Sequence, residues 1–159
     1  MDDGALADLY YRTTLELADD HGNLWQITPA STDGDDPGVI LGGFSDAYIL
    51  TAENPESSGE YSPEENAAAT VALAHELNES GVTYRPCPGY GFDVDHVEHG
   101  FAILAKAEQS GTLRDFTLDL ARRYRQNAIF HLHGGGLGIV GALRPGLNTL
   151  RAVEIRQAP

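Results

Sequence analysis

The chain has 159 residues, of which 42% are hydrophobic and 21% charged, so it is not globally disordered and has the size of one domain, residues 1–159. Its net charge of -14 makes direct nucleic-acid binding unexpected, because an acidic surface repels phosphate backbones. No apolar run approaches the ~20 residues of a membrane-spanning helix. The first residues also lack the basic start and apolar middle of a signal peptide, so we expect a cytoplasmic protein without membrane contact.

The acidic residues are concentrated in the N-terminal part of the chain. Residues 1–65 contain fifteen Asp and Glu against Arg12 alone, whereas residues 66–159 contain nine acids and nine bases. Surface solvation is the simplest explanation. Two sharper hypotheses are an acidic face for a basic protein partner and an acidic inhibitor that mimics nucleic acid, with Asp33, Asp35 and Asp36 in a loop.

The first elements are predicted from spacing and composition. Apolar side chains at helical intervals predict a helix over residues 5–19 within an acidic N-terminal extension, residues 1–43. Short strands are expected over residues 24–28 and 39–41. A stronger strand is predicted over residues 44–52, which are aromatic and β-branched and end at an Asn-Pro turn.

The clearest helix start lies at Ser62. Ser62 can cap the helix, Pro63 suits the first helical position, and Glu65 stands where a capping-box acid returns to the cap. We therefore predict a helix over residues 63–78. Its core-facing side chains are expected to be Val71, Ala74 and Leu77.

The C-terminal half alternates strands with one more helix. Strands are predicted over residues 82–85 and 101–105, a helix over 112–124, and a hairpin of strands 128–132 and 137–143 joined by glycines. The predicted fold is α+β. It consists of two layers, a mostly antiparallel sheet of about five strands with two or three helices mainly on one face.

Catalytic signatures are weak. The sequence contains no GxSxG elbow, no GxxxxGK[ST] loop and no GxGxxG before a helix. Cys87 lies between two prolines with no local group to lower the pKa of its thiol, which favours a packed cysteine. We assign no cofactor and no metal ion.

Histidines leave one alternative open. His131 and His133 share a strand face, and Asp93, Asp95, His96 and His99 lie in a preceding loop. A metal-dependent hydrolase would use Glu98 as base with His96, His99, His131 and His133. Partly exposed strand histidines explain the same pattern without a metal.

Four segments together resemble a known family. They are AYILTAENP, SPEENAAATVALAHELNESGVTYRPCPGYG, HVEHGFAILA and ARRYRQNAIFHL. In this order they resemble a bacterial domain-of-unknown-function family, the one numbered 3293, over about residues 44–140. The acidic extension and the tail of residues 144–159 lie outside the resemblance. The family implies a fold unit and no reaction.

The resemblance also implies a set of polar residues: Thr51, Asn54, Asn66, Glu98, Gln126 and Asn127. If the strand ends that carry them are neighbours, amides and one carboxylate line a rim suited to a small polar ligand. The same residues could instead form an Asx-turn, support a helix start and tie loops together. We expect a binding or regulatory module for a small polar ligand or a protein partner, and the hydrolase and the acidic inhibitor remain alternatives.

Overall fold

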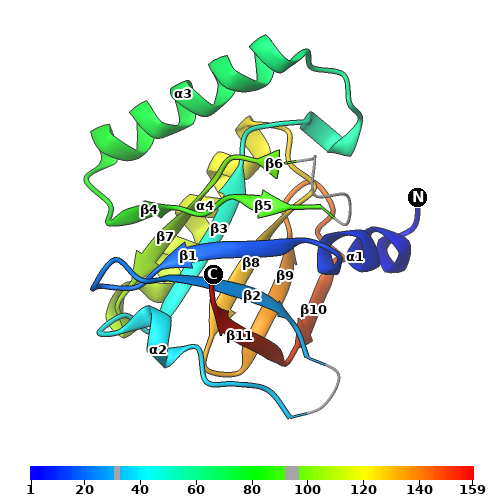
Figure 1. Ribbon diagram of the computed structural model, residues 1–159. Helices are drawn as coiled ribbons and strands as arrows, with labels where there is room; N and C mark the ends of the chain where they lie inside the picture. Colours follow the sequence, from blue (N-terminus) through cyan, green and yellow to red (C-terminus); the bar gives the residue numbers. More distant parts are fainter. Residues whose placement is uncertain (31–32, 92–96) are drawn as a thin grey trace.

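The computed structural model describes residues 1–30, 33–91 and 97–159. These residues form an α+β protein with four α-helices and eleven strands in two antiparallel sheets (Figure 1). The α-helices are α1 (Asp3–Tyr11), α2 (Gly38–Leu41), α3 (Pro63–Ser80) and α4 (Ser110–Arg123), and two short 3-10 helices are η1 (Pro55–Ser57) and η2 (Ala107–Gln109). None of the helices in these residues is long and apolar enough to cross a membrane.

The strands divide between two sheets. Sheet A has the order β11-β2-β1-β5-β6. Its strands are β1 (Thr14–Ala18), β2 (Leu24–Pro29), β5 (Gly89–Tyr90), β6 (Val97–Glu98) and β11 (Val153–Gln157). Sheet B has the order β10-β9-β8-β3-β7-β4. Its strands are β3 (Asp46–Thr51), β4 (Tyr84–Pro86), β7 (Gly100–Ala105), β8 (Ala128–His133), β9 (Gly136–Gly141) and β10 (Asn148–Arg151).

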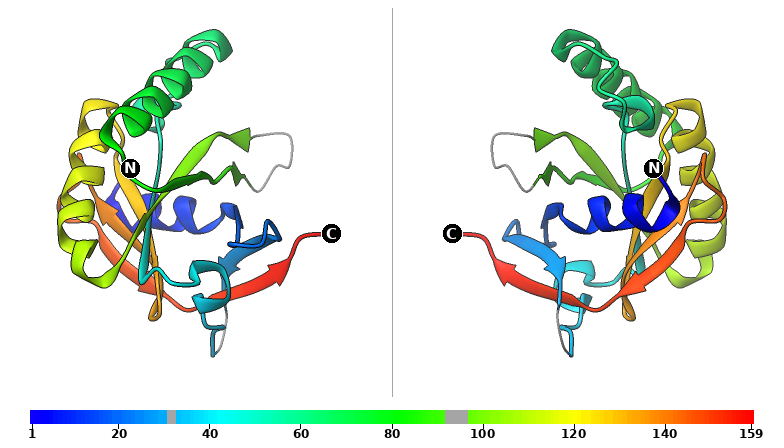
Figure 2. Two further views of the ribbon diagram at one scale, coloured as in Figure 1. Left: turned by 90° about the vertical axis from the view of Figure 1, so that its left-hand side faces the viewer. Right: turned by 90° about the vertical axis from the view of Figure 1, so that its right-hand side faces the viewer.

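The central strands of sheet B, β3, β7 and β8, are buried on both faces. Along β3, Tyr48 and Leu50 pack with the side chains of α3 and α4, whereas Ala47 and Ile49 belong to the core shared with sheet A and α1. Figures 1 and 2 show the layers: α4 covers the outer face of sheet B, and sheet A lies across its other face. Because successive strand side chains point to opposite faces, the apolar run Ala47–Leu50 supplies two cores at once.

The α+β class and the antiparallel pairing are confirmed. The predicted arrangement, one sheet of about five strands in two layers, differs from the structure, which has two sheets of five and six strands. The second sheet is built largely from the ends of the chain. The predicted helix over residues 5–19 stops at Tyr11, and β1 follows with Leu15 and Leu17 buried at every second residue. Pairing of β1 with β2, with Leu15 opposite Ile27, outweighs the helical spacing that Leu17 shares with the preceding apolar residues.

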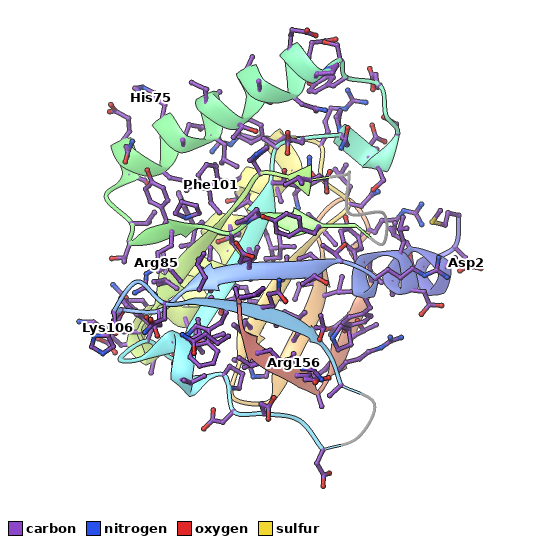
Figure 3. All side chains as sticks on the ribbon, viewed as in Figure 1. Asp2, His75, Arg85, Phe101, Lys106 and Arg156 are labelled. Carbon is purple, nitrogen blue, oxygen red and sulfur yellow. The ribbon has the colours of Figure 1, made fainter. Side chains whose placement is uncertain are left out.

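Two further local predictions are wrong. Residues 39–41 form the short helix α2 in place of a strand. In α3, Val71 is 70% exposed, whereas the other two predicted core residues, Ala74 and Leu77, do pack in the core together with Leu73. The capping box of Ser62 and Glu65 is present as predicted, and Gly81 ends the helix at φ 72°. In Figure 3, His75 lies on the outer side of α3 and Phe101 of β7 lies beneath the helix.

The C-terminal elements follow the prediction closely. Strands β8 and β9 form the expected hairpin through the glycine-containing turn. Strand β4 lies at the edge of sheet B. Pro86 and Pro88 have no backbone N–H to donate, and an edge position tolerates this because no strand lies beyond it. Helix α4 begins two residues before the predicted position and ends at Arg123.

The packing of α3 predicts a contrast between two of its side chains. Leu73→Ala should lower the free energy of unfolding by about 2–5 kcal/mol, because it leaves a cavity between α3 and sheet B. Val71→Ala should change it by less than about 0.5 kcal/mol, since Val71 is solvent-exposed. Urea unfolding of both variants measures the difference. Equal losses would show that Val71 packs in the core, as predicted from the sequence.

Candidate ligand-binding pocket

A pocket opens where two neighbouring strands of sheet B separate. Strands β3 and β8 pair from Asp46–His133 to Ile49–Phe130, whereas the pairing of β3 with β7 continues to Thr51–Gly100. Beyond Ile49 the edge of β3 that faces β8 is therefore free of ladder bonds, and residues from α1 and β1 cover the gap. The backbone divergence creates the space, and side chains from distant segments line it.

The pocket is small and has apolar walls with polar groups between them. It offers about 60 Å³ to the centres of water molecules, and one buried water needs roughly 10–15 Å³ measured this way. Roughly four to six water-sized atoms therefore fit. The apolar lining residues are Leu15, Ile49, Leu50, Ala128 and Phe130, and the polar ones include Tyr10, Thr13, Thr51, Asn54, Ser57, Glu98 and Gln126.

The structure brings most of the expected polar residues together. Thr51, Asn54, Glu98 and Gln126 all line the pocket. Asn66 lies directly behind Asn54, to which it is hydrogen-bonded. Asn127 takes a different position: it is buried, and its carbonyl accepts backbone hydrogen bonds from Ala142 and Arg144, so it ties the chain after β9 to the start of β8.

Two asparagines fix the orientation of Glu98. The backbone N–H of Asn54 donates to Oδ1 of Asn66 at 2.8 Å, and Nδ2 of Asn66 donates back to Oδ1 of Asn54 at 3.0 Å. The remaining amide group of Asn54, Nδ2, donates to Oε1 of Glu98 at 2.8 Å. Together these three hydrogen bonds engage the backbone N–H, the Oδ1 and the Nδ2 of Asn54. They hold one oxygen of the Glu98 carboxylate in place.

The segment that carries Asn54 is conformationally strained. Asn54, Glu56 and Ser57 have φ values of 49°, 55° and 57°, and Arg125 has a φ of 56°. A left-handed conformation costs a non-glycine residue about 1–2 kcal/mol. Arg125 holds the segment from the opposite side. Its carbonyl accepts the N–H of Glu56 at 2.7 Å, and its guanidinium pairs with Glu56 and, at 3.1 Å, with Glu60. Strain maintained in this way is typical of binding sites.

Gln126 forms the floor on the side of β8. Its side chain is buried, and Nε2 donates to the carbonyls of Glu53 at 3.0 Å and Tyr124 at 3.1 Å. Both amide hydrogens are thereby used. The atom that Gln126 can offer to a ligand is its carbonyl oxygen, a hydrogen-bond acceptor.

Glu53 and Thr51 close the end of β3. Glu53 is buried and accepts the backbone N–H of His99, whose Nδ1 lies 3.7 Å from the carboxylate. The Thr51 hydroxyl donates to the carbonyl of His99 at 3.3 Å and accepts the N–H of Glu53 at 3.0 Å. These bonds fasten the residue next to Glu98 to β3.

Two ionisable pocket residues are held neutral by burial. The pKa of Tyr10 is raised to about 12, mainly by burial and also by the Glu98 carboxylate, while hydrogen bonds with Ser57 and the Ala128 backbone oppose the shift. Burial also raises the pKa of the Cys87 thiol to about 12. Cys87 is thus a packed thiol at neutral pH, in agreement with the sequence analysis, and is poorly suited to act as a nucleophile.

The pocket continues into a wider mouth. This mouth encloses about 380 Å³ and shares Tyr10, Thr13, Asn54, Ser57 and Glu98 with the inner pocket. It adds Arg12, the C-cap residue of α1. Glu98 therefore stands at the boundary between an apolar interior and a polar opening.

His131 and His133 of the hydrolase alternative lie far from Glu98 along β3. His133 lies opposite Asp46 at the start of β3, and Thr51 near Glu98 is at the other end, about 17 Å away at ~3.3 Å per strand residue. Nε2 of His131 lies 2.6 Å from Oδ1 of Asp46, and its ring stacks on Tyr48. No group of three potential ligands able to hold a metal occurs within residues 1–30, 33–91 and 97–159. Asp93, Asp95 and His96 lie outside the described residues.

Two of the three loop acids proposed for nucleic-acid mimicry have local partners. Asp35 accepts the backbone N–H of Ile155 at 2.8 Å, and Asp36 accepts that of Gly38 at 2.9 Å. Asp33 is exposed. The carboxylates of Asp35 and Asp36 therefore hold the loop against β11 and the start of α2.

A family model described as "Protein of unknown function (DUF3293)" matches residues 50–129, half of the chain. The chain belongs to this family. The matched DUF3293 segment lies within the range expected from the sequence motifs and contains all six of the polar residues assigned from them. Tyr10, Arg12 and Thr13 lie outside it, so the pocket combines the DUF3293 segment with the preceding part of the chain. No curated protein matches the chain, and no solved structure does either.

The left-handed backbone of Asn54 predicts an order of stability for two variants. Asn54→Gly and Asn54→Ala both remove the side-chain hydrogen bonds to Asn66 and Glu98, but only alanine is strained at φ 49°. Asn54→Ala should therefore be less stable than Asn54→Gly by about 1 kcal/mol. Thermal and urea unfolding measure both. Equal stability would show that the strained conformation relaxes when the side chain is lost.

The His131 site predicts a loss of stability in mild acid. Burial lowers the pKa of His131 below 6.5, against the opposing hydrogen bond from Asp46. Since the folded-state pKa is depressed, the unfolded chain binds a proton first, and stability falls as pH decreases through the unfolded value near 6.5. Unfolding between pH 7 and pH 5 should show this slope. His131→Gln should flatten it, and the exposed control His75→Gln should not. A slope unchanged by His131→Gln would assign the effect to other groups.

Proposed function

We propose that the pocket binds a small polar ligand and that the protein serves as a binding or regulatory module. The observation that carries this proposal is the Glu98 carboxylate, which Asn54 and Asn66 hold at the opening of an apolar pocket. Two partly buried amides, hydrogen-bonded to each other and then to one carboxylate, are more than packing requires. They preorganise an acceptor for a ligand.

The lining indicates the chemistry of the ligand. Glu98 and the carbonyl oxygen of Gln126 accept hydrogen bonds, and the hydroxyl groups of Tyr10, Thr13 and Ser57 can donate or accept. Leu15, Ile49 and Phe130 offer apolar contact deeper inside. A suitable ligand therefore carries hydrogen-bond donors at one end and a short apolar group at the other.

The other proposed functions draw less support from the geometry. A hydrolase that uses His131 and His133 with Glu98 would need groups from opposite ends of β3. An acidic inhibitor would need carboxylates available to a partner, and Asp35 and Asp36 are engaged by the backbone. Ligand binding uses groups that already converge.

A cytoplasmic setting fits this proposal. Cys87 is the one cysteine of the chain and is buried as a free thiol. The chain therefore contains no internal disulfide, and a reducing compartment leaves its stability unchanged.

Screening small polar compounds by protein-observed NMR tests the proposal. Binding should shift resonances of Gln126 and Ala128 inside the pocket, because a ligand there contacts both residues. Glu98→Gln should weaken binding by about tenfold or more, since it removes a charge-assisted hydrogen bond. The matched control Glu108→Gln changes an exposed acid outside the pocket and should leave binding intact. Hits that bind Glu98→Gln equally well, or shift only surface residues, would overturn the proposal.

A further inference from the structure

We infer that the head group of the ligand is an uncharged primary carboxamide, whose N–H donates to Oε1 of Gln126 and whose carbonyl accepts from the hydroxyl group of Thr13. The inference rests on the proposed function, because it names a chemical class of ligand for the same pocket. It adds Thr13, which the sequence analysis did not select. Glu98 has partners of its own, Asn54 among them, and the inference does not depend on its charge.

Gln126 presents one hydrogen-bond acceptor to the pocket. Its two amide hydrogens are used by the carbonyls of Glu53 and Tyr124, at 3.0 and 3.1 Å, and these two acceptors fix which end of the amide is the oxygen. Oε1 has no partner among the described residues, although no fully buried side-chain oxygen or nitrogen in them lacks one. Oε1 is therefore open to the pocket that Gln126 lines, even though the residue is only 5% exposed. A largely buried acceptor in this position requires a donor.

The Thr13 hydroxyl is the second polar group of the pocket with no partner among the described residues. Thr13 lines both the inner pocket and its mouth, and its Cγ2 methyl packs over Gly89, where a Cβ atom would lie 2.9 Å away. A hydroxyl group donates as well as accepts. Four other polar side chains of the inner pocket have hydrogen-bond partners within the protein: Tyr10, Thr51, Asn54 and Ser57.

The inner pocket favours an uncharged head group. Neither Lys, Arg nor His occurs among its described residues, so a carboxylate would have no cationic partner and would place an acceptor against Oε1 of Gln126. Tyr10 and Cys87 are neutral at pH 7. An ammonium group needs several acceptors when it leaves water, and Gln126 offers one. A carboxamide carries the donor that Gln126 requires and the acceptor that suits Thr13.

The size of the interior limits the rest of the ligand. The inner pocket offers about 60 Å³, room for roughly four to six heavy atoms. Leu15, Ile49 and Phe130 supply apolar walls beside the two polar groups. A short branched alkyl chain on the carboxamide fits these walls, whereas a peptide segment is too large.

Three compounds of nearly identical shape test the head group. They are 3-methylbutanamide, 4-methylpentan-2-one, in which a methyl replaces the NH₂ group, and 3-methylbutanoate, in which a charged oxygen replaces it. Binding is measured by NMR titration of the full chain, followed at the resonances of Gln126 and Ala128. The amide should bind tighter than the ketone by about tenfold or more, because the ketone leaves Oε1 of Gln126 without a donor. The carboxylate should bind more weakly than the amide for the same reason and because it is charged.

The variant Thr13→Val tests the second contact. It removes the hydroxyl, keeps the methyl over Gly89 and breaks no hydrogen bond with a described residue, so the melting temperature should stay at the wild-type value. Affinity for 3-methylbutanamide should fall by about fivefold. The control Thr112→Val changes an exposed threonine of α4 outside the pocket and should leave the affinity unchanged. Gln126 is kept, because its N–H groups hold Glu53 and Tyr124.

Each outcome separates this inference from the proposed function. If the ketone binds as tightly as the amide, or if the carboxylate binds tighter, the carboxamide is excluded and the ligand pocket stands. If Thr13→Val binds the amide as tightly as the wild type, the contact with Thr13 is excluded. If no compound of this series or of the general screen shifts Gln126 or Ala128, the pocket proposal fails as well.

Discussion

The end of the pairing between β3 and β8 is the constraint on which the site depends. Both strands are buried on two faces, so they are held rigidly as far as Ile49 and Phe130. Past that point β3 stays with β7, and the next residues turn away from β8. A backbone edge without a partner strand must be covered or given polar neighbours. Gln126 meets this need by donating to the carbonyl of Glu53, and the remaining space forms the pocket.

The asparagine pair links that backbone feature to chemistry. Asn54 occupies a left-handed conformation that asparagine tolerates better than most residues, and this conformation turns its backbone N–H toward Asn66 in α3. The capping box places the first turn of α3, and with it Asn66, at a fixed position. The orientation of Glu98 thus depends on a helix start some thirty residues earlier in the chain. The helix start at Ser62, which neighbouring residues determine, therefore influences the pocket through the hydrogen bonds of Asn66 and Asn54.

Local signals also mark what could be predicted. The capping box of Ser62, the hairpin of β8 and β9 and the apolar runs of β3 and β7 are decided by neighbouring residues, and all were predictable. In sheet A, β2 was predictable over residues 24–28, but β1 was not, because Leu17 continues the helical spacing of the preceding apolar residues until β2 is placed beside it. The family motifs led to Thr51, Asn54, Glu98 and Gln126, whereas Tyr10 and Arg12 depend on where α1 docks and carried no signal of their own.

The pocket has two parts of different origin: a hydrogen-bonded frame within the family segment, and a mouth completed by the preceding residues. The DUF3293 segment supplies the splayed strands, the asparagine pair and Glu98. The preceding part of the chain supplies one wall, with Tyr10 and Arg12. Because α1 contacts the pocket through side chains and contributes no strand to sheet B, a change at Arg12 alters the charge of the mouth without disturbing the hydrogen bonds that hold Glu98. The charge of the mouth can therefore change while the frame that orients the Glu98 carboxylate is retained.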